Sequence, residues 1–197
     1  MVSFDPGARK VEAVVVGASA GGVEALSRIF AGLPETTALS IVVVLHLPEG
    51  RESQLAQLFD RKLALAVSEA RDKEAIARSH VYFAPPGYHL AIEAGRVFSL
   101  STDDPVNFSR PSIDVLMESA ADTYGENLLG ILLTGSNCDG AAGMRAIKDQ
   151  GGLTIAQDPL EAHVPVMPQA AIDRGAADYV FDLTQIHRAL MSFATPA

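Results

Sequence analysis

The chain has 197 residues, of which 48% are hydrophobic and 20% are charged, a balance typical of a globular domain and not of a disordered segment. Its formal net charge of −9 argues against a nucleic-acid or anionic-membrane surface, because both partners select basic patches. Cys138 is the single cysteine, which excludes a disulfide within the chain, and no apolar run is long enough for a membrane span. We therefore expect a cytoplasmic protein with no nucleic-acid partner and no membrane insertion.

In chain order, residues 1–10 read as a polar lead-in without the apolar stretch of a signal peptide, and residues 11–197 read as one domain. Continuous apolar runs predict buried strands over 11–16, 40–46, 127–134, 153–157 and 178–181. Shorter strands are predicted over 64–68, 81–84, 89–92 and 97–100, of which the last three form an antiparallel edge. Helical spacing of apolar residues predicts helices near 22–32, 53–63, 109–120, 139–148, 168–174 and 183–193.

This alternation of strands and helices predicts the fold class. We expect an α/β fold with a doubly wound, mostly parallel sheet, helices on both faces and a short antiparallel hairpin at one edge. Functional sites in such sheets lie beyond the carboxyl ends of the strands. That rule selects Ser19, His46 and Asp139, because each follows a strongly apolar predicted strand.

The turn that carries Ser19 is rich in glycine. Three β-branched residues end at Gly17, and Gly21 and Gly22 let the backbone turn tightly before a helix begins. Ser19 is therefore either an ordinary helix cap or a nucleophile at the positive end of a helix. A dinucleotide-binding turn is disfavoured, because that fingerprint places a glycine where Ser19 stands and an acidic residue where His46 stands.

The three selected residue types form a catalytic triad. A serine hydroxyl becomes a strong nucleophile when a histidine takes its proton, and a carboxylate orients that histidine and stabilises its cation. We expect Asp139 to be held ionised by the helix that begins beside it. Backbone N–H groups in the 135–140 turn, or at Gly21 and Gly22, are candidates for an oxyanion hole. No cysteine–histidine cluster has metal-binding spacing, so we predict neither a metal nor a cofactor.

A set of short motifs spread over most of the chain carries a family resemblance. In order, the motifs are Val16–Gly22, Leu45–Pro48, Ala84–His89, Ser109–Asp114, Leu132–Gly135, Asp139–Met144, Ala156–Asp158 and Met167–Pro168. They resemble the catalytic domain of chemotaxis protein-glutamate methylesterases (CheB). The resemblance implies a doubly wound α/β fold, a triad of Ser19, His46 and Asp139, and hydrolysis of glutamate γ-methyl esters on cytoplasmic chemoreceptor helices. Some members of the family also deamidate receptor glutamines.

The chain departs from the family pattern beside the triad. Ala20 stands where the family usually has a threonine, and Ser136 and Asn137 replace the usual Met-Gly of the turn before Asp139. The family's oxyanion donor is a backbone N–H at the position of Ser136, so that function does not depend on the side chain. We expect strain at Asn137 if its backbone is left-handed. These departures keep a second hypothesis open, in which the domain is a non-catalytic partner-binding module.

The resemblance also implies a protein partner, a methyl-accepting chemotaxis receptor, and leaves the oligomeric state open. Members of the family commonly carry an N-terminal phosphoreceiver domain that covers the site, and ten residues before the first strand are too few for one. For this chain alone we therefore expect an open site whose catalytic face binds the receptor. Arg110 is our candidate for a basic patch there, although a buried structural ion pair is an equally good interpretation of this arginine.

Overall fold

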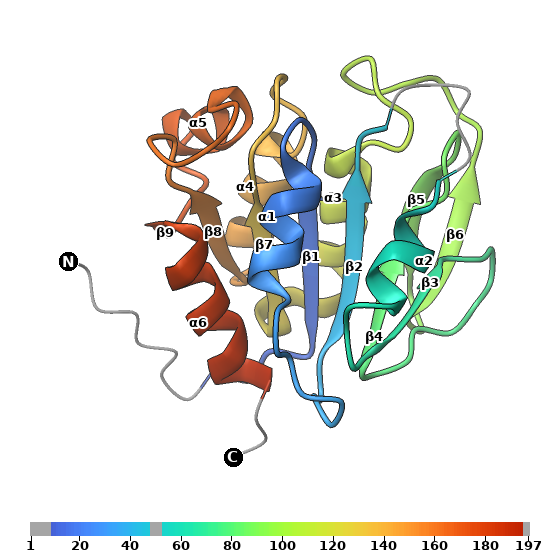
Figure 1. The fold of residues 1–197 in the computed structure, drawn as a ribbon. Coiled ribbons are helices and arrows are strands. Elements are labelled where there is room, and N and C mark those ends of the chain that lie inside the picture. Colours follow the sequence, from blue (N-terminus) through green and yellow to red (C-terminus); the bar gives the residue numbers. More distant parts are fainter. Residues whose placement is uncertain (1–8, 48–52, 195–197) are drawn as a thin grey trace.

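The computed structural model describes residues 9–47 and 53–194, which fold as layers of helices around one sheet (Figure 1). Seven parallel strands form this sheet in the order β3-β4-β2-β1-β7-β8-β9. They are β1 (Ala13–Ala18), β2 (Ser40–Leu45), β3 (Ala66–Glu69), β4 (His80–Phe83), β7 (Leu128–Leu132), β8 (Leu153–Gln157) and β9 (Tyr179–Phe181). A separate antiparallel pair consists of β5 (His89–Glu93) and β6 (Val97–Ser101).

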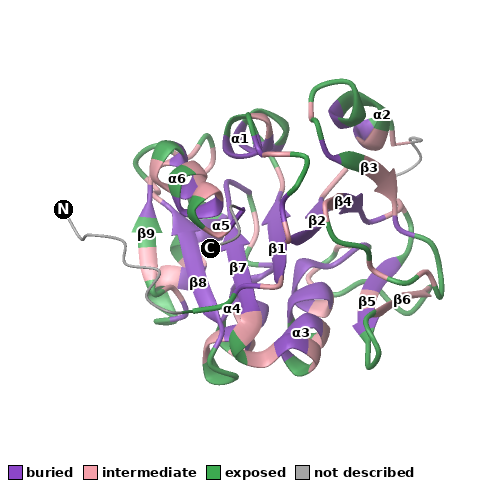
Figure 2. Cartoon of the chain, turned by 90° about the horizontal axis from the view of Figure 1, so that it is seen from below, coloured by how far each residue is buried: buried purple, intermediate pink, exposed green. Residues whose placement is uncertain are grey.

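The helices cover both faces of the sheet (Figure 2). They are α1 (Gly22–Ile29), α2 (Leu55–Asp60), α3 (Ile113–Tyr124), α4 (Ala141–Asp149), α5 (Val166–Asp173) and α6 (Leu183–Ala194). Side chains of a strand alternate between the two faces, and β1 is apolar at every position but Gly17. Val14 and Val16 therefore pack into the core under α1 and α6, while Ala13 and Val15 pack into the core under α3 and α4. Each central strand is buried on both faces, which explains its continuous apolar run.

The predicted fold class is confirmed, with one correction to the strand pairing. The run at 81–84 was expected in an antiparallel edge, but β4 pairs in parallel with β2 on one side and β3 on the other. Val81, Tyr82 and Phe83 are all buried, as an interior parallel strand requires. The antiparallel hairpin is limited to β5 and β6, and β5 packs against α3.

The order of the strands creates a switch point at the centre of the sheet. From β1 the chain passes to β2 on one side, and it later returns to place β7 on the other side of β1. In open α/β sheets, binding and catalytic sites form outside the carboxyl ends of the strands at such a point. The segments that follow β1, β2 and β7 therefore meet at one edge, which is at the top of Figure 1.

Two sequence-based expectations concern the outside of the domain. Residues 1–8 of the predicted lead-in lie outside the described residues, so the boundary between the lead-in and the domain stays a prediction. Within the part of the chain that the structure describes, no helix combines the length and apolar character needed to cross a membrane.

Burial of the central strands predicts where stability resides. Val42 in β2 is fully buried, whereas Val180 in β9 is 44% exposed. We expect Val42→Ala to lower the free energy of unfolding by about 2 kcal/mol, through lost transfer energy and the cavity left behind. The same change at Val180 should alter it by less than about 0.5 kcal/mol. Urea denaturation of both variants tests this, and equal losses would contradict the assignment of the core.

Candidate active site

The turn between β1 and α1 places Ser19 at the switch point. The parallel ladder continues past the strands, since the Ser19 N–H donates to the Thr134 carbonyl at 2.9 Å and the His46 N–H donates to the Ala18 carbonyl at 3.0 Å. The ends of β7 and β2 thus hold the turn from both sides. Gly21 follows with φ +82°, a left-handed conformation that begins α1. Ser19 is half-buried, and its hydroxyl makes no hydrogen bond to the described residues.

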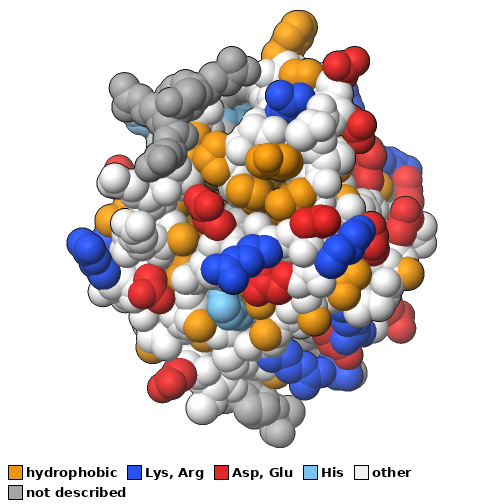
Figure 3. All heavy atoms as spheres, turned by 90° about the vertical axis from the view of Figure 1, so that its right-hand side faces the viewer, with side chains coloured by type: hydrophobic (Ala, Val, Ile, Leu, Met, Phe, Trp, Pro, Cys, Tyr) orange, Lys and Arg blue, Asp and Glu red, His pale blue; other side chains and the backbone are white. Residues whose placement is uncertain are grey.

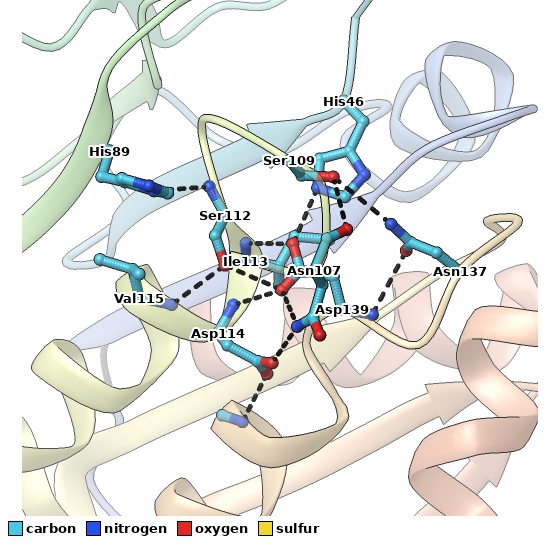
Figure 4. A network of polar contacts seen from close by, with 11 residues as sticks. His46, His89, Asn107, Ser109, Ser112, Ile113, Asp114, Val115, Asn137 and Asp139 are labelled. Atoms are coloured by element: carbon cyan, nitrogen blue, oxygen red, sulfur yellow. Dashed lines mark hydrogen bonds and ion pairs between the residues drawn. The ribbon is translucent and has the colours of Figure 1, made fainter. Parts of the chain in front are cut away.

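His46 and Asp139 are joined directly, although they are 93 residues apart in the chain. The Nε2 atom of His46 lies 2.9 Å from Oδ2 of Asp139 (Figure 4). The Asp139 side chain is completely buried, and the His46 side chain is 12% exposed. Two of the three predicted triad residues therefore form a pair in the structure. Ser19 is brought beside His46 by the backbone of neighbouring strands, without a bond between their side chains.

Asp139 is the centre of the polar network in Figure 4, and five donors converge on its carboxylate. Besides His46, four groups donate to it. They are the Ile113 N–H at 2.7 Å, the Asp114 N–H at 3.1 Å, the Ser112 hydroxyl at 2.8 Å and the Asn107 amide at 3.2 Å. The helix that holds this carboxylate is thus α3. We predicted the helix that follows Asp139 in the chain, α4, and that prediction is wrong, because Gly140 caps α4 and the Asp139 side chain turns away toward α3.

These contacts keep Asp139 ionised. Burial by itself raises the pKa of a carboxyl group, because it removes water from the charged form. In Asp139 the hydrogen bonds from His46, from the Ile113 and Asp114 N–H groups and from Ser112 outweigh burial, so its pKa lies below the usual value. A buried carboxylate with this many donors is suited to orient a histidine and to stabilise its positive charge.

Asp114 is a second buried carboxylate, and it connects α3 back to α4. Its Oδ1 accepts the Gly143 N–H at 2.8 Å, in the first turn of α4. Asp139, which lies just before α4, therefore caps α3, and Asp114, which lies in α3, caps α4. The contact is close, because a Cβ atom added at Gly143 would lie 2.4 Å from the Met117 Cβ and 3.3 Å from the Asp114 carbonyl oxygen. Burial raises the pKa of Asp114, and the neighbouring negative charge of Asp139 raises it too. The hydrogen bond from the Gly143 N–H lowers this pKa but does not outweigh the other two effects.

Asn107 and His89 complete the surroundings of the two carboxylates. The Asn107 amide nitrogen donates to Asp114 at 2.8 Å as well as to Asp139, so one amide bridges both groups. His89 is almost fully buried, and its Nδ1 accepts the Ser112 N–H at 3.2 Å. Its Nε2 lies 3.1 Å from the Asp104 carbonyl. His89 is therefore a hydrogen-bonded structural histidine at the start of β5.

A buried threonine ties the nucleophile turn to two other segments. The Thr134 hydroxyl donates to the Ala20 carbonyl at 2.8 Å and accepts the Val164 N–H at 2.9 Å. Its own N–H donates to the buried Gln157 side chain at 2.9 Å. The Gly135 N–H donates to the Val164 carbonyl at 3.0 Å, so the segment after β8 lies against the turn after β7. These bonds fix the positions of the backbone on both sides of Ser19.

The predicted oxyanion donors lie on these fixed turns. The backbone N–H groups of Ala20, Gly21 and Ser136 donate no hydrogen bond to the described residues. All three residues are exposed at the edge of the sheet. His163 lies against Gly21, since a Cβ atom added there would be 2.7 Å from the His163 Cβ. The site therefore offers unpaired donors beside a serine, as an oxyanion hole requires.

Two expectations about neighbouring residues need correction. Asn137 does not have a left-handed backbone, so the strain expected there is absent. Its side chain instead accepts the Asp139 N–H at 3.3 Å and donates to the Ser109 hydroxyl at 3.4 Å, which stabilises the turn locally. Arg110 is exposed, and its Nη1 donates to the Thr102 and Asp103 carbonyls at 2.9 and 3.0 Å. The interpretation of Arg110 as part of a buried ion pair is therefore wrong.

Several residues of the site escaped the sequence analysis. Ser112 and Asp114 stand in a motif that we noted as a helix start and as part of the family resemblance, without a role for either side chain, and Ser112 is indeed the cap of α3. Asn107 and Thr134 gave no local signal, because their partners lie far along the chain. Among the described residues, no group of three or more histidine, cysteine, aspartate or glutamate side chains is placed to bind a metal ion.

The low pKa of Asp139 predicts a pH-dependent stability. A carboxyl group whose folded pKa is depressed stabilises the fold fully above its unfolded pKa, about 3.9, and loses that effect as the pH falls through the folded pKa. We expect Asp139→Asn to lower the free energy of unfolding by about 2 kcal/mol or more at neutral pH. Below about pH 4 the difference from the wild type should shrink, since the carboxyl group of the unfolded chain takes up a proton first and the folded one follows as the pH falls through its depressed pKa.

Urea denaturation over a range of pH measures this difference. Asp122→Asn is the matched control, because Asp122 is exposed on α3, and it should have a small effect at every pH. A difference for Asp139→Asn that stays constant from neutral to acid pH would show that its charge does not stabilise the fold.

Comparison with known proteins agrees with this geometry. Residues 14–190 match the family model described as CheB methylesterase. A putative protein-glutamate methylesterase/protein-glutamine glutaminase of Leptospira interrogans is 44% identical over 175 residues, which cover 89% of this chain and 91% of the relative. An Anaeromyxobacter dehalogenans protein-glutamate methylesterase/protein-glutamine glutaminase 2 is 43% identical over 183 residues, covering 93% of this chain and 53% of that protein. The crystal structure of the Thermotoga maritima CheB methylesterase catalytic domain matches with a TM-score of 0.88 and 36% identity, over 93% of this chain and 98% of that chain. This chain therefore belongs to the CheB methylesterase family.

Proposed function

We infer that this chain is a protein-glutamate methylesterase, a carboxylic ester hydrolase that converts glutamate γ-methyl esters to glutamate and methanol. The observation that carries this function is the buried His46–Asp139 pair beside Ser19, at the switch point of the sheet. The arrangement provides a base oriented by an ionised carboxylate next to a serine in a glycine-rich turn, which is the composition that ester hydrolysis requires. Membership of the CheB family supports the same reaction.

The contacts of His46 assign a role to each ring nitrogen. Nε2 is engaged with Asp139, so in the neutral ring it carries the proton and donates to the carboxylate. Nδ1 is then the nitrogen that accepts the proton of the Ser19 hydroxyl. The bond between Ser19 and Nδ1 forms when substrate is bound, because catalytic hydrogen bonds are often longer in the free enzyme and tighten in the complex. Asp139 stabilises the imidazolium ion that results, without itself taking up the proton.

The reaction proceeds in two stages. Ser19 Oγ attacks the ester carbonyl carbon while His46 takes the hydroxyl proton, and the oxyanion that forms is bound by the N–H groups of Ser136, Ala20 and Gly21. The tetrahedral intermediate collapses, and methanol leaves with the proton from His46. Water then attacks the acyl-serine with His46 again as the base, which releases the glutamate side chain and restores Ser19. Only side chains, backbone amides and water take part.

The proposed substrate is a methyl-accepting chemotaxis receptor in the cytoplasm. The names of the relatives also include a glutaminase, and deamidation would use the same acyl-serine with ammonia as the leaving group. Arg110 remains a candidate substrate contact, since it is exposed and only its Nη1 is hydrogen-bonded to the described residues. The guanidinium can form an ion pair with a receptor carboxylate while its Nη1 stays hydrogen-bonded to the loop carbonyls.

The departures near the triad do not favour the alternative of a non-catalytic module. Ala20 contributes its carbonyl and N–H through the backbone, which any residue supplies, and Asn137 fits its turn without a left-handed conformation. A fluorophosphonate probe separates the two hypotheses. The esterase should be labelled at Ser19 and lose labelling in Ser19→Ala, whereas a wild type that stays unlabelled would support a binding module.

Kinetics of triad variants test the assignment of roles. Ser19→Ala and His46→Ala should each lower kcat on methylated receptor by on the order of 10³-fold or more, and the double variant should be little worse, because the residues act as one unit. Methanol release from receptor that carries γ-methyl esters is the measurement. Losses that multiply in the double variant would mean that Ser19 and His46 do not act together.

Thr134 provides a test of the fixed backbone. Thr134→Val leaves the Ala20 carbonyl and the Val164 N–H without their partner, so we expect a loss of about 1–3 kcal/mol in unfolding free energy. We also expect a clear fall in kcat, because the turns that carry Ser19 and Ser136 lose their common anchor. Thr154→Val is the matched control, since Thr154 is also buried but its hydroxyl bonds Asp178. The control should lose stability but keep kcat, and equal kcat in the two variants would contradict this role of Thr134.

A further inference from the structure

The loop between β6 and α3 presents a phenylalanine fully to solvent. Phe108 is completely exposed, and it has φ 61° directly after Asn107 with φ 50°. Two successive residues of positive φ are the pattern of a tight turn that favours Asn-Gly, and here phenylalanine stands at the position where glycine has no steric penalty. A bulky residue with positive φ is an outlier that the surroundings must enforce.

The surroundings of Phe108 do enforce this conformation. Val106 and Ser109 exchange two backbone hydrogen bonds, at 3.2 and 2.9 Å, and so close the turn around it. Asn107, the residue before Phe108, donates to the buried carboxylate of Asp139. Ser109, the residue after Phe108, accepts a hydrogen bond from the Asn137 amide through its hydroxyl. Both neighbours of Phe108 are thus bonded to the candidate active site. These contacts hold the large apolar ring of Phe108 in water.

A few other exposed apolar side chains lie near Phe108 or Ser19 in the chain. Of the eight large hydrophobic residues that are exposed among the described ones, Val106 lies in the same turn as Phe108, and Val23 lies in the first turn of α1, just after Ser19. The others are Leu58, Tyr88, Leu160, Val166 and Val180. Figure 3 shows the side of the molecule that is on the right in Figure 1, and hydrophobic side chains gather in the upper half of that side. Exposed apolar side chains of this kind are typical of surfaces that bind a partner.

Charge does not provide the same attraction at this loop. Asp103 and Asp104 are exposed close to Arg110 in the chain, and the whole protein has a formal net charge of −9. A helix rich in glutamate gains little from such a surface, and a methylated glutamate is itself uncharged. Apart from Arg110, apolar contact is therefore the main interaction that the loop can offer to a substrate segment.

We propose that Phe108 is a substrate-contact residue, which packs against apolar side chains on the helical receptor segment that carries the methylated glutamate. The proposal rests on the proposed function, and it adds the type of contact that brings the ester to Ser19. The turn holds the ring outward before substrate arrives, so little conformational freedom is lost when it is buried. Phe108 contributes to KM, whereas the triad determines the chemical step.

The variant Phe108→Gly separates this role from a structural one. Glycine relieves the positive-φ backbone, so the midpoint of urea denaturation should stay the same or rise. On a methylated receptor fragment, KM should rise about tenfold while kcat changes less than about twofold. The rate of Ser19 labelling by a small fluorophosphonate should not change. Phe108→Leu keeps an apolar side chain and should retain most of the affinity, and Val180→Ala is the control for an exposed apolar residue away from the site.

Salt provides a second readout. Because the contact is apolar, the ratio of KM between Phe108→Gly and the wild type should be similar at about 50 mM and about 500 mM NaCl. An unchanged KM in Phe108→Gly overturns the proposal, and so does a parallel fall of kcat and labelling rate, which would make the residue structural. If the wild type neither labels nor releases methanol, the proposed function fails and this proposal fails with it. An active wild type with an unaffected variant removes the proposal alone.

Discussion

The buried carboxylate of Asp139 is the interaction on which the rest of the site depends. An ionised group with no exposure to water is stable only when donors surround it, and the fold supplies five from the end of β2, the start of α3 and the loop before α3. Each donor fixes a segment that the site needs. The two oxygens of Asp139 orient His46, cap α3 and hold the loop that carries Phe108 through Asn107.

A second buried carboxylate, Asp114, lies beside Asp139. Asp114 and Asp139 share the amide of Asn107, and their pKa values shift in opposite directions. Burial and the neighbouring charge of Asp139 raise the pKa of Asp114, whereas the hydrogen bonds to Asp139 outweigh burial and lower its pKa. The donors of Asp139 include the histidine and two N–H groups of a helix start, which stabilise its charge beside the proposed base. Asp114, with fewer donors, serves the close packing of α3 on α4.

The fold and the positions of Ser19 and His46 at one edge of the sheet could be predicted because they follow from local patterns. The apolar runs that end before Ser19 and His46 are long enough to identify buried strands, and a parallel sheet brings such ends to one edge. The run at 81–84 was misassigned, since four apolar residues in a row look alike in parallel and antiparallel pairing. The helix that holds Asp139 and the bridging amide of Asn107 could not be predicted, because these contacts join residues 26 and 32 positions apart through the tertiary fold.

The bonds of Thr134 have a consequence for the protein while it is being made on the ribosome. Ser19 emerges well before Thr134, which holds its turn and follows 114 residues after the Ala20 carbonyl that it binds. The Thr134 hydroxyl in turn accepts a bond from Val164, a further 30 residues along the chain. A nascent chain therefore carries its serine without the complete set of contacts that fix this region until Val164 has emerged. Esterase activity should begin only when the segment after β8 has folded onto the turn after β1.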